Sequence, residues 1–170
     1  MFCSNRSIIP AFTVIASLLV APSVRAVAPE IKDDGKFFSA EAVKKANKEI
    51  REIERKFGMD LLIETFAGVP GDQAAKVKAM SAEERAKFFR NWSVDRAEAA
   101  VVNGVYIMVV KDPPRLEIEI TPKARAALNN DAFEKLRSGL LKKFRDKHFD
   151  EGLAEAVSFV KERFAAVESK

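Results

Sequence analysis

The feature that most constrains the fold is an uninterrupted apolar run, VYIMVV, at residues 105–110. It has the length of a β-strand and follows Asn103-Gly104, a dipeptide typical of turns. A strand without polar positions is typical of the centre of a parallel sheet, where both faces of the strand are buried. We therefore expect a sheet that helices cover on both faces.

Two further strands are expected beside this run. Residues 60–66 (DLLIETF) form a short apolar segment between glycines, and residues 116–120 alternate apolar and acidic side chains. The first should pair in parallel with residues 105–110 through a helical crossover, whereas a tight turn makes the last strand antiparallel. Glu117 and Glu119 then share one face. We interpret them as a charged sheet edge, with a functional acidic stripe as the alternative.

Amphipathic periodicity predicts the helices. Apolar residues recur at intervals of three and four after N-cap signals such as Ser39 and Ser81. Helices are expected at residues 40–57, 81–92, 131–147 and 150–168, with 73–80 as a further candidate. Phe88, Phe89 and Trp92 have helical spacing, which favours a core role over an aromatic binding patch. The element order predicts an α/β fold: an α/β/α sandwich with a small mixed central sheet flanked by helices.

The first 26 residues have the pattern of a secretory signal peptide. Arg6 precedes an apolar run at residues 8–20, and small residues lead to Ala26, after which we expect cleavage. The run is shorter than the roughly 20 residues that span a bilayer. An uncleaved anchor is the alternative. The expected organisation is a signal peptide at 1–26, a lead-in at 27–36 and a single domain at 37–168, in a periplasmic or extracellular protein.

The composition excludes several kinds of chemistry. Cys3 is the only cysteine and would leave with the signal peptide, which excludes thiol catalysis and thiolate metal sites. The only histidine, His148, stands between two expected helices and is more typical of a helix junction than of a catalytic base. The formal net charge of +4 comes from interspersed charges, so we expect no nucleic acid partner.

Carboxylates at turns and element ends are the remaining candidates for chemistry. They are Asp33, Asp34, Asp72, Asp112 and Asp131. Oxygen ligands suit Ca²⁺ or Mg²⁺, and such an ion lowers the pKa of a bound water enough for hydrolysis. Asp72 and Asp112 follow expected parallel strands, and ligands of open α/β sheets gather at that end. The alternative is that these aspartates cap helices and solvate turns.

The order of several short motifs resembles the TPM domain family over about residues 31 to 165. The motifs are IKDDGKFFS at 31–39, the strand at 60–66, Trp92, Asn103-Gly104-Val105, residues 115–119, Asn130-Asp131 and residues 149–156. The family groups thylakoid-lumen acid phosphatases of photosystem II repair, an auxiliary subunit of acetylcholine receptors and many exported bacterial proteins. The resemblance implies an α/β/α sandwich outside the cytoplasm, often at a membrane, with a divalent-metal site and weak acid phosphatase activity in some members.

The resemblance also implies candidate metal ligands. Asp33 is similar to the leading Asp of the family, Asn103 to its Asn before Gly, and Asp131 to the Asp of its Leu-Thr-Asp-like segment. Asp112 matches a more variable acidic turn, and Asp34 is adjacent to Asp33. Ligands of one Ca²⁺ must lie about 2.3 to 2.6 Å from the ion, so Asp33, Asn103 and Asp131 should converge if they share it.

One departure from the family pattern bears on function. Many members carry a Gly-rich segment where this chain has Ile120-Thr121-Pro122-Lys123, and a remodelled loop can remove a metal or phosphate pocket. We therefore favour an exported accessory or binding module that contacts a protein partner through its loops, and a membrane-associated partner fits this expectation. The alternative is a divalent-metal-dependent acid phosphatase with calcium or magnesium. The mixed charges of the last two helices favour a solvated face, with partner docking as the alternative.

Overall fold

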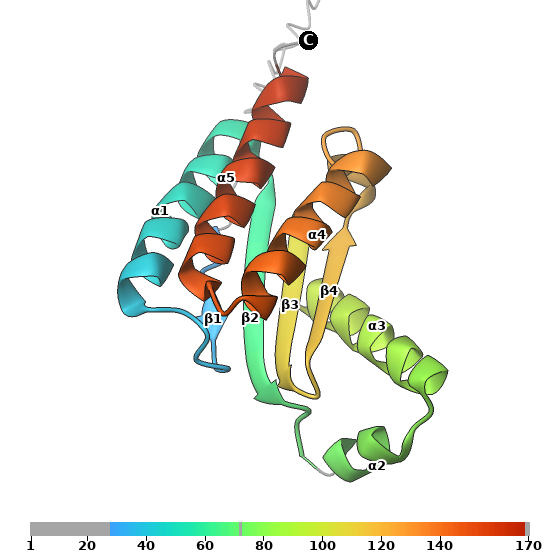
Figure 1. Ribbon diagram of the computed structural model, residues 1–170. Helices are drawn as coiled ribbons and strands as arrows, with labels where there is room; N and C mark the ends of the chain where they lie inside the picture. Colours follow the sequence, from blue (N-terminus) through green and yellow to red (C-terminus); the bar gives the residue numbers. More distant parts are fainter. Residues whose placement is uncertain (1–27, 72, 169–170) are drawn as a thin grey trace, which may run out of the picture.

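Four strands form one mixed sheet in the order β1-β2-β3-β4, and helices pack on both of its faces (Figure 1). The computed structural model describes residues 28–71 and 73–168. The architecture is the α/β/α sandwich that the sequence predicts. The expected signal peptide at residues 1–26 lies outside the described residues, as does Asp72.

The strands confirm the expected pairing. β2 (Asp60–Gly68) and β3 (Gly104–Asp112) are parallel, and β4 (Arg115–Ile120) runs antiparallel to β3. Residues 104–110 of β3 are all buried, as their apolar run predicts. The structure adds β1 (Lys32–Asp33), which pairs in parallel with β2 inside the expected lead-in. A strand of two residues has no periodicity that a sequence pattern could reveal.

Three helices cover one face of the sheet. They are α1 (Ala40–Phe57), α4 (Asn130–Arg145) and α5 (Phe149–Glu168), and they lie in front of the strands in Figure 1. Ser39 caps α1 because its side chain accepts a hydrogen bond from the N–H of Ala42, and Gly58 ends the helix at φ 60°. None of the described helices has the length and apolar character to cross a bilayer.

Two helices cover the other face. α2 (Gln73–Ala79) precedes α3 (Ala82–Ala99), which begins with the expected capping box of Ser81 and Glu84. Phe89 is fully buried, and Phe88 and Trp92 pack against the same cluster, which confirms their core role. α3 continues beyond the expected end at Trp92 and packs mainly over β3 and β4.

The two glutamates of β4 each have a hydrogen-bond partner at the sheet edge. β4 is an edge strand, as the interpretation of Glu117 and Glu119 requires. The hydroxyl of Ser93 on α3 donates to Glu119, whereas Glu117 pairs with Arg115 at 2.6 Å. Burial raises the pKa of Glu119 more than the Ser93 hydrogen bond lowers it. Both glutamates are half-buried on the face toward α3.

The sheet has two chemically different ends. The carboxyl ends of β1, β2 and β3 share one end with the turn between β3 and β4. At the other end, the antiparallel β4 leads into the short helix η1 (Pro122–Ala124) and the start of α4. Eight strand positions separate the ends of β3, or about 26 Å.

Candidate functional site

Asp33 lies at the carboxyl end of the sheet and organises the turn that follows it. Its Oδ1 accepts hydrogen bonds from the N–H of Phe37 at 3.0 Å and from the hydroxyl of Thr65 at 2.5 Å. Its Oδ2 accepts from the N–H of Phe38 at 3.0 Å. Both carboxylate oxygens therefore act as acceptors within the turn between β1 and α1, which is a structural role of the kind that Asp commonly fills.

Asp34 and Asp112 lie at the same end of the sheet as Asp33. Asp34 is exposed beside it, and Asp112 ends β3 in register with Gly68 of β2. A carboxylate oxygen of Asp112 lies 3.7 Å from the ammonium nitrogen of Lys78, a long and exposed ion pair. Three of the five proposed metal ligands thus share the carboxyl end.

Asn103 and Asp131 lie at the opposite end. The backbone N–H of Asn103 donates to Asp60 at 2.7 Å and its side-chain amide donates to the carbonyl of Gly58 at 3.3 Å. Asp131 is exposed in the first turn of α4, whose N-cap is Asn129. The structure therefore does not bring Asp33, Asn103 and Asp131 together. Within residues 28–71 and 73–168, no group of three or more His, Cys, Asp or Glu side chains is arranged to hold a metal ion.

A cavity opens at the carboxyl end between α4 and the hairpin of β3 and β4. It has a volume of about 500 Å³, and we call it the basic pocket. Its walls combine apolar side chains with Lys and Arg, and no Asp or Glu is among its lining residues. The cationic lining residues are Lys111, Arg115, Arg137, Arg145 and Lys147. Pockets of this volume are typical of ligand sites.

Three phenylalanines build one wall of the basic pocket. The ring centroids of Phe37 and Phe149 are 5.2 Å apart, edge to face, and those of Phe144 and Phe149 are 5.5 Å apart. The turn after Asp33 presents Phe37, while Phe144 and Phe149 flank the junction of α4 and α5. All three rings are half-buried, so part of each remains accessible.

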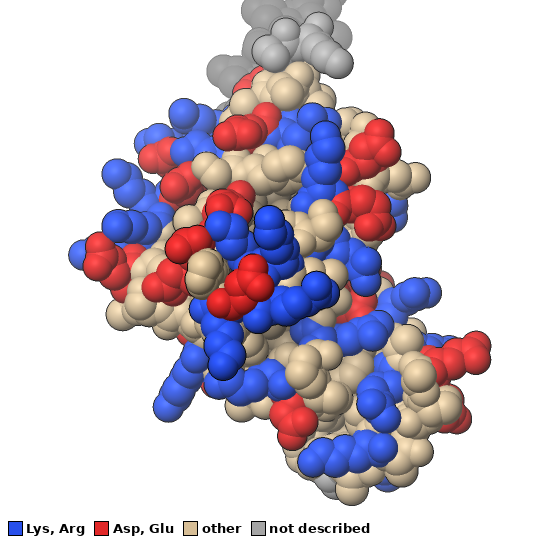
Figure 2. All heavy atoms as spheres, in the orientation of Figure 1, with Lys and Arg blue, Asp and Glu red and all other residues tan. Residues whose placement is uncertain are grey.

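The cations of the pocket differ in their partners. Arg115 pairs with Glu117, and Lys111 donates to the carbonyl of Gly35 at 3.2 Å with its ammonium 5.3 Å from the Phe37 ring centroid. In the described part of the chain, Arg137, Arg145 and Lys147 have no carboxylate partner. Arg137 lies at the middle of α4, Arg145 ends the helix, and Lys147 follows it. Lys and Arg side chains gather over this end of α4 in Figure 2.

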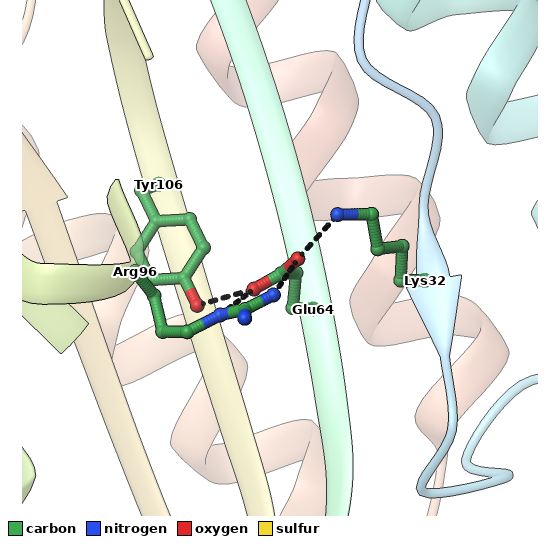
Figure 3. A network of polar contacts seen from close by, with 4 residues as sticks. All are labelled: Lys32, Glu64, Arg96 and Tyr106. Carbon is green, nitrogen blue, oxygen red and sulfur yellow. Dashed lines mark hydrogen bonds and ion pairs between the residues drawn. The ribbon is translucent and has the colours of Figure 1, made fainter. Parts of the chain in front are cut away.

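A second charged cluster has the opposite character (Figure 3). Glu64 of β2 is only 1% exposed and accepts two hydrogen bonds from the guanidinium of Arg96, at 2.8 and 2.7 Å. The ammonium of Lys32 and the hydroxyl of Tyr106 also donate to it, at 2.8 and 2.9 Å. This network joins β1, β2, β3 and α3 around one carboxylate.

The electrostatics of the network follow from burial and pairing. Burial alone would raise the pKa of Glu64, but the hydrogen bonds from Arg96, Lys32 and Tyr106 outweigh it and lower that pKa. Hydrogen bonding to Glu64 raises the pKa of Arg96, and burial next to the carboxylate raises that of Tyr106. Glu64, Arg96 and Tyr106 therefore keep their usual charge states at neutral pH.

A family model now identifies the fold. The model described as TPM domain matches residues 31–163. The chain belongs to the TPM domain family. The resemblance that the motifs indicate is thereby confirmed, over nearly the same residues. No curated protein matches this TPM domain.

Solved structures of other bacterial proteins share the fold of this TPM domain. The N-terminal domain of a P. gingivalis protein, solved by NMR, is 17% identical with a TM-score of 0.63, covering 81% of this chain and 82% of that one. The BA42 protein of Bizionia argentinensis is 18% identical, with a TM-score of 0.50 and coverages of 77% and 83%. An N-terminal domain from Corynebacterium glutamicum is 8% identical, with a TM-score of 0.52 and coverages of 91% and 87%. At these identities the likeness shows the fold alone.

Sequence reasoning missed both charged clusters of the TPM domain. Glu64 offered one signal, because it is a single carboxylate inside an apolar strand and so requires a buried partner. The basic pocket offered a weaker one, since Arg137, Leu141 and Arg145 recur every four residues on α4. Chemically, the pocket suits an anionic group joined to an apolar one.

Proposed function

We propose that this TPM domain is an accessory module that binds an acidic partner protein through the carboxyl end of its sheet. The observation that carries the proposal is the set of unpaired cations, Arg137, Arg145 and Lys147, beside a pocket with no carboxylate in its lining. Complementary charge steers association and selects partners. A surface with surplus cations therefore favours an acidic partner.

The apolar part of the same surface supports a protein partner. Aromatic residues and Arg are enriched at protein interfaces, and hot spots combine them in pockets. Phe37, Phe144 and Phe149 remain half-buried around the basic pocket, close to the cations of α4. Residues 1–26 predict export, so we place the partner in the periplasm, outside the cell or on the outer side of a membrane.

A peptide titration tests the proposal. We expect a fluorescein-labelled peptide rich in Glu to bind the purified protein, with an affinity that falls as salt is added, because screening weakens exposed charge pairs. The same peptide with Lys in place of Glu should not bind. The double variant Arg137→Glu and Arg145→Glu should abolish binding.

The matched control makes the same change of charge at two other exposed positions of α4. Lys135 and Lys142 are exposed on α4 and do not line the basic pocket. The double variant Lys135→Glu and Lys142→Glu should bind the peptide nearly as the unmodified protein does. Equal loss in both double variants would mean that net charge alone attracts the peptide, which contradicts a site at the pocket.

The alternative function, a divalent-metal-dependent phosphatase, draws on the placement of Asp33, Asp34 and Asp112 at one end of the sheet. Calcium titration calorimetry on the purified protein and on Asp33→Ala tests it, with a phosphatase assay on the same samples. Calcium binding that disappears in the variant, together with phosphate release that follows it, would support the phosphatase. Turnover unchanged by Asp33→Ala and Asp131→Ala would remove that mechanism.

A further inference from the structure

The basic pocket is a cavity rather than a flat charged patch, which bears on what enters it. We propose that it holds an aromatic or large aliphatic side chain of the acidic partner, while Arg137 and Arg145 bind acidic residues on either side of that anchor. The inference rests on the proposed function and specifies the partner segment. In an extended segment the pattern is acidic residue, any residue, anchor, any residue, acidic residue.

The volume and walls of the pocket fit an anchor side chain. A cavity of about 500 Å³ accommodates an aromatic ring together with part of the adjoining backbone. Leu141 and Phe144 of α4 form one side and Leu116 of β4 lies in the lining opposite them. Burying an aromatic side chain against such walls supplies the largest apolar contribution that one residue can make to binding.

The aromatic wall is held in place before any partner binds. Phe37 is fixed because the carboxylate of Asp33 accepts the N–H of Phe37 and that of Phe38. The rings of Phe37 and Phe144 stack at 6.3 Å, and both contact Phe149. A preformed wall loses little conformational entropy when the anchor binds. More of the favourable free energy from burying the anchor therefore contributes to affinity.

The spacing of the cations gives the pattern of the partner segment. Arg137 and Arg145 are eight helical residues apart, or about 12 Å along α4, with Leu141 midway between them. In an extended chain, residues two before and two after an anchor are about 13 Å apart and project on the same side as the anchor. Two acids at those positions reach both guanidinium groups while the anchor enters the pocket.

Guanidinium groups suit this role because they bind carboxylates through two parallel hydrogen bonds. Arg137 and Arg145 form no ion pair with a carboxylate of the described residues. Binding of the partner segment therefore breaks no such ion pair. Lys111 and Lys147 add positive charge to the pocket lining. An acidic segment therefore displaces only water from the two arginines.

Labelled peptides separate the anchor from the charges. The first carries Glu-Ser-Phe-Ser-Glu between neutral flanks, the second has Ala in place of Phe, and the third has Gln in place of both Glu. A fourth, Ser-Glu-Phe-Glu-Ser, moves the acids next to the anchor. We expect the first to bind most tightly. Replacing Phe should weaken binding about tenfold, replacing both Glu at least tenfold, and the shifted pattern about threefold.

Protein variants test the same assignment from the other side. Leu141→Ala should weaken the Phe peptide and leave the Ala peptide nearly unchanged, which separates a pocket effect from a general loss of fold. Arg137→Gln with Arg145→Gln should weaken the Phe peptide about tenfold. Lys135→Gln with Lys142→Gln is the matched control and should change binding less than twofold.

The outcomes distinguish this inference from the proposed function. Equal binding of the Phe and Ala peptides, with dependence on the two arginines retained, overturns the anchor but keeps an acidic partner. If the Phe peptide binds equally to the arginine variant and to the lysine control variant, both the anchor and the acidic-partner proposal are overturned. If dodecanoate, or vesicles containing phosphatidylglycerol, bind through the arginines while no peptide does, the ligand is a free amphiphile or a membrane, and the peptide assignment is wrong.

Discussion

Two pairs of cations in this TPM domain have opposite surroundings. Lys32 and Arg96 converge on the buried carboxylate of Glu64 (Figure 3), whereas Arg137 and Arg145 have no acidic partner among the described residues. The residue types are similar and both pairs reach solvent. A Lys or Arg side chain therefore stabilises the fold where a buried carboxylate accepts its hydrogen bonds. Where no such carboxylate is near, the side chain remains available for binding.

The two situations have different energetics. A buried carboxylate is stable only while its donors remain, because its lost hydration has to be replaced by hydrogen bonds and opposite charge. Glu64 has four such hydrogen bonds and links three strands to α3. An exposed unpaired arginine loses little hydration on folding, so its removal costs the fold little.

The largest effect is expected at Glu64. Glu64→Ala leaves Tyr106 and Arg96 without their acceptor and opens a space between β2 and α3. Breaking a fully buried pair costs about 3–5 kcal/mol; because Arg96 is 38% and Lys32 57% exposed, we expect about 2–4 kcal/mol of unfolding free energy. Urea unfolding measures it. Glu117→Ala, which removes one half-buried pair in β4, is the control and should cost about 1 kcal/mol or less.

A smaller loss is expected at Asp33. Asp33→Ala removes two backbone hydrogen bonds and the one from Thr65, for about 1–2 kcal/mol. Asp34→Ala, at the exposed neighbour, should change stability by less than about 0.5 kcal/mol. Because Asp33 positions Phe37, its variant should also weaken the anchored peptide. If Asp33→Ala and Asp34→Ala change the unfolding free energy equally, Asp33 does not stabilise the turn as described.

The pH dependence provides a test of about the same size. The folded-state pKa of Glu64 is lowered, so its stabilisation is fully present above the unfolded pKa and is lost as pH falls through the lower folded value. Unfolding free energy of the unmodified protein should fall below pH 4.5 more steeply than that of Glu64→Gln. Parallel curves for the two proteins would contradict a lowered pKa at this site.

The smallest effect on stability is expected for the free cations. Arg137→Gln with Arg145→Gln should change unfolding free energy by less than about 0.5 kcal/mol, since neither side chain is paired or buried. The same assay on Lys135→Gln with Lys142→Gln sets the baseline for α4. A loss of 2 kcal/mol or more, on the order of a broken buried pair, would mean that the arginines support the fold.

Much of the fold was predictable because local signals agreed with tertiary burial. The apolar run of β3, the capping box at Ser81 and the stop at Gly58 each gave the expected element. β1 was not predictable, since its two residues pair with Glu64 and Thr65 of β2, which lie 32 residues further along the chain. Pairing with a distant strand, rather than a local pattern, makes it a strand.

The site was less predictable because it depends on distances across the sheet. Asp112 was expected at the carboxyl end, and it lies there. Asp33 lies at the same end because it belongs to β1, a strand that the sequence did not predict. Asn103 and Asp131 were candidates because of the family resemblance. They lie at the opposite end of the sheet, about one strand length from the carboxyl end. The pairing of Glu64 with Arg96 spans 32 residues, and no spacing rule relates them. In the sequence, the cations of α4 have the pattern of an ordinary solvated helix face. The observation that favours a docking surface is the cavity beside them, which the sequence does not reveal.

The most direct test crosses two variants with two assays. Urea unfolding and titration with the Glu-Ser-Phe-Ser-Glu peptide are measured on Glu64→Gln and on Arg137→Gln with Arg145→Gln. We expect Glu64→Gln to lower stability and to leave the peptide Kd within about twofold. The arginine variant should weaken the peptide about tenfold and leave stability nearly unchanged. A peptide Kd that the arginine variant does not change would contradict the central claim, that the unpaired cations of α4 form the binding surface.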